Sequence, residues 1–230
     1  IGDYIIPRKA DINKARTQGD KRTELVFDGT ALHAAELLSA SLHGMLTNSS
    51  TAWFSLRFRN AELDSDDKAK EWLQSVEDVM YLAFSRSNFH EQVHELYHDL
   101  ITFGTAVMFI ESDPKYQLQF STRHISECYL SEDEKGRVDT VYRKFKMPNR
   151  AVLQRFGEKV LSTKRLTEIK DKPYEKTTLL HAVFPNDERD ITKVTNINKP
   201  FTSIYVDHEE KITLSEGGFD ELPYCCPRYL

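Results

Sequence analysis

The spacing of apolar residues changes near Glu111, and this change limits the folds that the chain can adopt. Before Glu111, apolar residues recur at three- and four-residue steps, which is typical of amphipathic helices. After it, short apolar or alternating runs separated by turn residues predict strands. Because helices come first and strands follow without regular alternation, the sequence predicts an α+β fold: N-terminal helices followed by a mainly antiparallel β region.

Three helices are predicted before that change. The first is expected to begin at Asp28, acting as its N-cap, and to run to Leu46. A polar break then leads into the aromatic run Trp53–Phe58, which we expect to be a strand. The apolar residues expected to form the buried stripe of the first helix are Ala31, Leu32, Ala35, Leu38, Leu42, Met45 and Leu46.

Start signals mark the other two helices. An acidic cluster at 64–67 predicts a helix start there, because carboxylates stabilise the positive end of the helix dipole. Asn88 and Glu91 have the spacing of a capping box, so the third helix is expected to begin after Asn88. The predicted buried faces comprise Trp72, Leu73, Val76, Val79, Met80, Ala83 and Phe84 in the second helix and Phe89, Val93, Leu96, Tyr97, Leu100 and Ile101 in the third.

The second half is expected to consist mostly of strands. A turn at 134–136 joins two of them in a predicted hairpin, because its glycine can adopt positive φ. A short helix is expected at 150–156, ended by Gly157, and the lysine-bearing stretch 159–176 is expected to be a solvated or partner-facing surface. The predicted strands are 105–110, 116–120, 128–130, 138–145, 178–184, 203–207 and 211–214.

Composition and charge exclude several classes of protein. The 230 residues are enough to bury a sizeable core, and no apolar run approaches the roughly 20 residues that cross a bilayer. The formal net charge is −5, so the chain lacks the overall attraction for phosphate that drives non-specific DNA binding. The three cysteines, two of them adjacent at Cys225 and Cys226, suit neither a disulfide framework nor a paired zinc-binding motif.

Several short blocks of residues follow one another in a recognisable order. In the first half they are Trp53-Phe54 after small and polar residues, Trp72-Leu73, Ser87-Asn88-Phe89, and Leu100 to Gly104-Thr105. In the second half they are Tyr129, Asp133, Gly136, Val138, Asp139, Val141, Arg143, Phe145, Phe156-Gly157, and Leu222-Pro223-Tyr224 with Arg228. Taken together, these blocks resemble the N-terminal part of the portal, or head-to-tail connector, proteins of short-tailed, podovirus-type bacteriophages.

The resemblance implies a structural subunit with no catalytic activity. Such subunits form a closed ring, usually a dodecamer, at one capsid vertex, and genome DNA is packaged and ejected through it. The implied partners are copies of the same chain, terminase, coat or scaffolding protein, tail adaptor proteins and the double-stranded DNA in the channel. No membrane and no cofactor are implied, and the implied location is the virion, after assembly in the host cytoplasm.

Within such a subunit, the chain is expected to form the wing-like body. The resemblance implies an N-terminal arm at 1–26, a helical part of the wing at 27–111 and a β-rich part at 112–230. The stem and clip of the subunit would lie beyond Leu230. Because Ile1 is not an initiator methionine, we expect the chain to be a fragment of something longer.

One motif supports an alternative function, that of a zinc-dependent hydrolase. Residues His90 to His94 read H-E-x-x-H, in which two imidazoles hold Zn²⁺ and Glu91 acts as the general base. His98 lies about 12 Å further along the helix axis than His90, too far to share a metal with bonds of about 2 Å. A third ligand would have to come from His124, His181 or Glu111. We therefore predict no catalytic, cofactor-binding or metal-binding residues and keep the hydrolase as the alternative.

Overall fold

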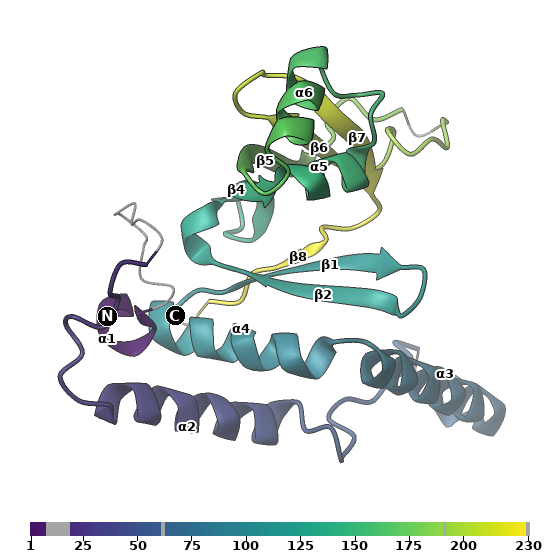
Figure 1. The fold of residues 1–230 in the computed structure, drawn as a ribbon. Helices are drawn as coiled ribbons and strands as arrows, with labels where there is room; N and C mark the ends of the chain where they lie inside the picture. The colour runs from purple at the N-terminus through teal and green to yellow at the C-terminus, as the bar shows by residue number, and fades with distance from the viewer. Residues whose placement is uncertain (8–18, 61–62, 191, 229–230) are drawn as a thin grey trace. The chain divides into compact units, whose positions relative to one another are not determined.

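The chain forms two compact units. The computed structural model describes residues 1–7, 19–60, 63–190 and 192–228 (Figure 1). The first unit combines Ile1–His124 with Cys225–Leu230, and the second is Ile125–Tyr224. Helices dominate the beginning of the chain and antiparallel strands follow, so the predicted α+β class is confirmed. Among the described residues, no helix is long and apolar enough to cross a membrane.

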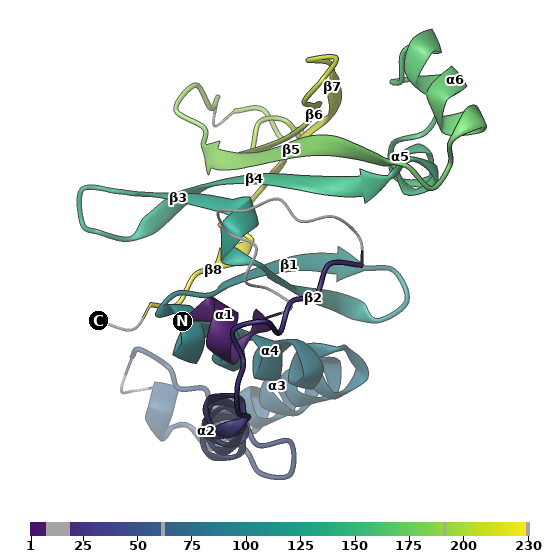
Figure 2. The same cartoon turned by 60° about the vertical axis from the view of Figure 1, so that its left-hand side comes forward.

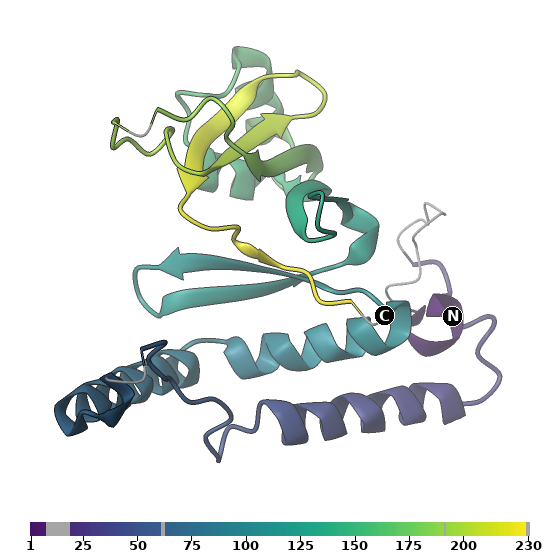
Figure 3. The same cartoon turned by 180° about the vertical axis from the view of Figure 1, so that it is seen from behind.

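The first unit contains a pair of antiparallel helices. Its helices, within the residues described, are α1 (Gly2–Ile5), α2 (Thr30–Leu46), η2 (Leu63–Ser65), α3 (Asp67–Arg86) and α4 (Phe89–Phe103). Figures 1 and 3 show α2 and α4 side by side, with α3 extending away from the beginning of α4. Gly29 rather than Asp28 takes the N-cap position of α2, although Asp28 Oδ1 accepts a hydrogen bond from the Thr30 N–H at 2.9 Å.

The core of the first unit lies between α4 and a β-hairpin. The hairpin pairs β1 (Val107–Asp113) with β2 (Gln117–Arg123), and β8 (Tyr224–Cys225) lies on the other side of β1. Gly104 ends α4 in the left-handed conformation, with a φ of 73°, so the chain turns directly toward β1. The buried members of this core are Phe89, Val93, Leu96, Ala106, Met108 and Phe120.

The start of α4 is anchored to the hairpin instead of being capped as predicted. The Asn88 side chain makes no capping hydrogen bond; its Nδ2 donates to the Phe120 carbonyl at 2.8 Å and its Oδ1 accepts from the Phe120 N–H at 2.9 Å. Ser87 Oγ accepts from the Phe89 N–H at 3.2 Å. The predicted capping box of Asn88 and Glu91 is therefore wrong, because Asn88 is used to join α4 to β2.

Residues 53–58 are held against α3 and do not form the predicted strand. The Tyr81 hydroxyl accepts hydrogen bonds from the Trp53 and Phe54 N–H groups, each at 2.8 Å, and donates to the Phe54 carbonyl at 2.7 Å. The Glu77 carboxylate accepts a further backbone N–H of this segment. The strand prediction is wrong because helix side chains, in place of a neighbouring strand, satisfy these backbone groups.

The second unit is built on a five-stranded antiparallel sheet with the order β3-β4-β5-β6-β7. The strands are β3 (Cys128–Glu132), β4 (Val138–Pro148), β5 (Lys176–Pro185), β6 (Phe201–Asp207) and β7 (Thr213–Phe219). Each strand pairs with the next along the chain. The predicted hairpin is confirmed, because β3 and β4 pair and Gly136 in the turn between them has a φ of 73°.

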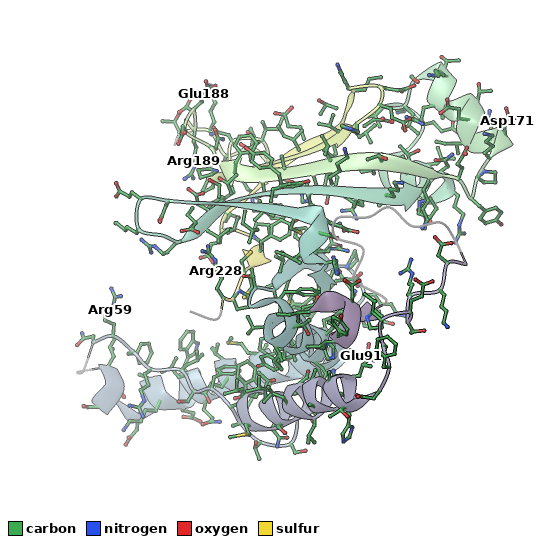
Figure 4. All side chains as sticks on the ribbon, turned by 90° about the vertical axis from the view of Figure 1, so that its left-hand side faces the viewer. Arg59, Glu91, Asp171, Glu188, Arg189 and Arg228 are labelled. Carbon is green, nitrogen blue, oxygen red and sulfur yellow. The ribbon has the colours of Figure 1, made fainter. Side chains whose placement is uncertain are left out.

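Two helices, α5 (Asn149–Phe156) and α6 (Thr163–Asp171), follow β4 and precede β5 (Figure 2). Figure 4 shows Asp171 at the end of α6 and Glu188 on the loop after β5, at opposite ends of the sheet. The prediction of a solvated surface at 159–176 misses α6, whose Ile169 is buried and whose Leu166 is half-buried between its lysines. The buried members of this core are Phe145, Val152, Leu161, Ile169, Leu179 and Leu214.

A buried ion pair joins α6 to the end of β6. Arg165 Nε donates to Asp207 Oδ2 at 2.9 Å, and its Nη2 donates to Asp207 Oδ1 at 3.1 Å. The Arg165 side chain is 5% exposed and that of Asp207 is 1% exposed. Glu168 and Glu209 accept further bonds from the same guanidinium, at 2.7 and 3.0 Å. A planar guanidinium suits this paired geometry and a lysine ammonium does not.

Replacing Tyr81 by Phe tests whether one hydroxyl anchors residues 53–58. We expect the free energy of unfolding to fall by about 1–3 kcal/mol, because two part-buried N–H groups lose their acceptor. Urea unfolding measures the change. Tyr142→Phe is the matched control, since Tyr142 is exposed on β4, and it should cost less than about 0.5 kcal/mol. Equal losses in the two variants would contradict the anchoring role.

Replacing Arg165 by Met tests the buried ion pair. We expect a loss of about 3–5 kcal/mol in unfolding free energy, because the Asp207 carboxylate is left buried without its cation. Lys164→Met, one residue away at a side chain that is 77% exposed, should change stability by less than about 0.5 kcal/mol. Adding Asp207→Asn to Arg165→Met should recover part of the lost unfolding free energy in denaturant titrations. A double variant that is no more stable than Arg165→Met would contradict this explanation.

Candidate functional site

The H-E-x-x-H residues lie where α4 contacts α2. His90 Nδ1 is 3.4 Å from His43 Nε2 of α2, and the ring centroids of His43 and His94 are 5.9 Å apart. Sequence reasoning missed His43, because histidines far apart in the chain meet here only through the packing of the two helices. The motif therefore belongs to a helix–helix contact.

Glu36 and His98 extend this contact along the two helices. Glu36 Oε1 is 3.6 Å from His94 Nε2, and its Oε2 is 3.5 Å from His98 Nε2. The buried Ser39 side chain donates to the His94 carbonyl at 3.2 Å. We call the four histidines together with Glu36 the histidine row: Glu36 and His43 on α2, and His90, His94 and His98 on α4.

The histidine row gives the zinc-hydrolase alternative no support. Across the part of the chain that the structure describes, no group of three or more His, Cys, Asp or Glu side chains is arranged so that it could hold a metal ion. His124, one of the third ligands considered, packs edge-on against Phe103 with ring centroids 5.6 Å apart. Glu91, the general base that such an enzyme would need, is an exposed side chain on α4 (Figure 4).

The surroundings of His43 favour its neutral form. Burial, together with the nearby His90 and His94, lowers the pKa of His43 below its usual value of 6.5. The folded unit therefore binds a proton at His43 less readily than the unfolded chain does. Well above pH 6.5, His43 is neutral in both states and does not change the free energy of unfolding. As the pH falls from 6.5 toward the lower pKa of the folded state, the unfolded chain is protonated first and the free energy of unfolding decreases.

Large apolar side chains of α2 and α3 are left uncovered. Ala35 and Ser39 are the buried residues of α2, and none of the described residues of α3 is buried. The predicted buried stripes are therefore partly wrong: Met45 is 81% exposed, Trp72 60% and Val79 64%. The exposed apolar residues of the two helices, here called the α2–α3 apolar surface, are Leu37, Leu38, Met45, Leu46, Trp72, Val79 and Leu82.

The exposed side of α2 also lacks charged residues. Glu36 is the one Asp, Glu, Lys or Arg between Thr30 and Leu46, and it faces the histidine row. A helix face exposed to water normally carries charged or polar residues. Several large exposed apolar side chains on one helix are typical of a face that another protein surface covers. The α2–α3 apolar surface is therefore the strongest candidate for an assembly contact in the described residues.

The chain matches a known protein family from end to end. Residues 1–230 match the family model described as "Bacteriophage head to tail connecting protein". The chain is 30% identical to the "Probable portal protein" of Bordetella phage BPP-1 over 233 residues and 30% identical to the "Portal protein" of Salmonella phage epsilon15 over 237 residues. Each comparison covers 100% of this chain but 42% of the relative, so the chain spans less than half of their length.

These matches confirm the resemblance read from the short blocks of residues. The family match includes both units, the helices with the α2–α3 apolar surface and the five-stranded sheet alike. The chain belongs to the bacteriophage head-to-tail connecting proteins.

Proposed function

We propose that the chain is part of a structural subunit of a viral portal ring. The ring would join the capsid to the tail, and genome DNA would pass through it during packaging and ejection. The match of the whole chain to the head-to-tail connecting proteins carries this proposal. The portal names of the two relatives support it. Catalysis has no part in the proposed role.

The α2–α3 apolar surface supports a subunit that is completed by neighbours. A closed ring requires each subunit to present two different faces to its neighbours. Covering exposed apolar side chains stabilises such a contact by about 25 cal/mol per Å² removed from water. Trp72 is large enough to dominate a contact of this kind, since interface energy is concentrated in a few buried anchors, tryptophan among the commonest.

The acidic balance of the chain suits a channel through which DNA slides. Each phosphate that a protein neutralises steepens the fall of log binding constant with log salt concentration by about 0.9. Many such contacts would slow the passage of DNA. A net charge of −5 limits these contacts. The partners proposed from the family resemblance are double-stranded DNA in transit, copies of this chain, terminase, coat or scaffolding protein, and tail adaptor proteins.

Within the subunit we assign the chain to the wing-side body. The proposed parts are an arm at 1–26, a helical part at 27–111 and a β-rich part at 112–230, with the stem and clip beyond Leu230. Residues 8–18 of the arm lie outside the described residues. The proposed location is the portal vertex of the virion, with assembly in the host cytoplasm.

Electron microscopy of the full-length protein tests this role. We expect closed rings with a central channel. Replacing both Val79 and Leu82 by Asp should lower the fraction of subunits in rings by on the order of tenfold or more, because charge is placed at a contact that must lose water. Gln74→Asp adds charge at an exposed residue of the same helix and should leave assembly unchanged.

Two results would count against the proposal. A full-length protein that stays monomeric at the concentrations used for assembly would contradict the ring itself. Rings that form as readily with Val79→Asp and Leu82→Asp as with Gln74→Asp would show that the α2–α3 apolar surface is not the contact.

A further inference from the structure

The attachment of α2 to α4 depends on few buried groups. Of the α2 side chains, Ala35 is 6% exposed and Ser39 is fully buried. The polar contacts between the two helices include those of the histidine row and the bond from Ser39 to the His94 carbonyl. At the end of α2, the Tyr97 hydroxyl also donates to Thr47 Oγ1 at 3.3 Å. Because only two side chains of α2 are buried, groups that change charge between pH 5 and 8 can affect this contact.

The central pair of the histidine row suits neutral imidazoles. His43 Nε2 and His90 Nδ1 are 3.4 Å apart, so one nitrogen can donate its proton to the other while both rings are neutral. When both rings are protonated, each of these nitrogens is a donor and no hydrogen bond can form between them. Two positive charges then face each other between the helices, and His94 lies close enough to His43 to add a third.

Carboxylates near the row oppose this effect only in part. Protonated His94 and His98 are attracted to Glu36, but the Glu36 side chain is 60% exposed and solvent screens the attraction. Asp78 of α3 lines the same cavity as His90. α1 lies beside the end of α4, whereas His90 is near its beginning (Figure 1). The acidic residues of the helices α1 to α4 are Asp3, Glu36, Asp67, Glu71, Glu77, Asp78, Glu91, Glu95 and the buried Asp99.

We propose that the histidine row is an acid-sensitive contact, which holds α2 against α4 at neutral pH and releases it when His43 and His90 are both protonated. The row lies within one chain, so the release does not depend on ring formation. Opening would break the bond from Ser39 to the His94 carbonyl and uncover the Ser39 side chain. The histidine motif on α4 thus serves as a reversible attachment for α2.

Hydrogen exchange of the full-length protein, measured by mass spectrometry at about pH 7.5 and about pH 5.5, tests this proposal. After correction for the intrinsic effect of pH on exchange, peptides covering residues 30–46 should exchange on the order of tenfold faster at the lower pH. Peptides from β4 and β5, in the other unit, should keep their protection. An equal corrected rate in residues 30–46 at both pH values would overturn the proposal.

His43→Gln separates the row from general acid effects. Glutamine still donates and accepts hydrogen bonds but is not protonated in this range, so the acid-induced increase should disappear. His33→Gln is the matched control, because His33 is exposed on the same helix and outside the row, and it should respond as the unchanged protein does.

His90→Gln removes the other partner and should behave as His43→Gln does. Circular dichroism and exchange at about pH 7.5 check that each variant is folded before it is compared. If both variants opened on acidification as much as the unchanged protein, the histidine row would not be the acid-sensitive contact.

Discussion

The helical unit depends on one apolar contact, the packing of α4 against the hairpin of β1 and β2. Phe89, Val93 and Phe120 lie at its centre and are buried. Asn88 reinforces it by bonding to both backbone groups of Phe120. Helices in proteins are stabilised mainly by burying one face. Here α4 has such a face within its own unit, whereas α2 and α3 have far less to pack against.

The consequences for α2 and α3 follow from this shortage of partners. α3 is held by Phe84, which packs against the core, and by Tyr81, which binds the backbone of residues 53–58. Its apolar residues Trp72 and Val79 remain exposed. α2 buries Ala35 and Ser39 and contacts α4 through the histidine row. By contrast, the second unit covers its own sheet with α5 and α6 and adds the buried pair of Arg165 and Asp207. An assembly contact is therefore expected on the helical unit.

The sequence predicts an element well where the same chain buries the apolar face, or forms the turn, that the pattern indicates. The apolar stripe of α4 and the β3–β4 hairpin are correct, because a helical period and a glycine turn are local signals. The stripes of α2 and α3 are wrong in part, since periodicity shows which residues share a face but not whether the chain covers that face. α6 is missed because its lysines hide one buried apolar residue, Ile169, and the half-buried Leu166. No local sequence pattern singles out His43, and only the packing of α2 on α4 places it beside His90 and His94.

Accessibility of Trp72 to a fluorescence quencher tests most directly whether assembly covers the apolar surface. These 230 residues contain two tryptophans, so Trp53→Phe leaves Trp72 as their only reporter. Any tryptophan elsewhere in the full-length protein would also be replaced by Phe. Unassembled and assembled fractions, separated by size, would be titrated with iodide. We expect iodide to quench Trp72 strongly in the unassembled fraction and weakly in the assembled one. Equal quenching in both fractions would contradict the claim that neighbouring subunits complete this surface.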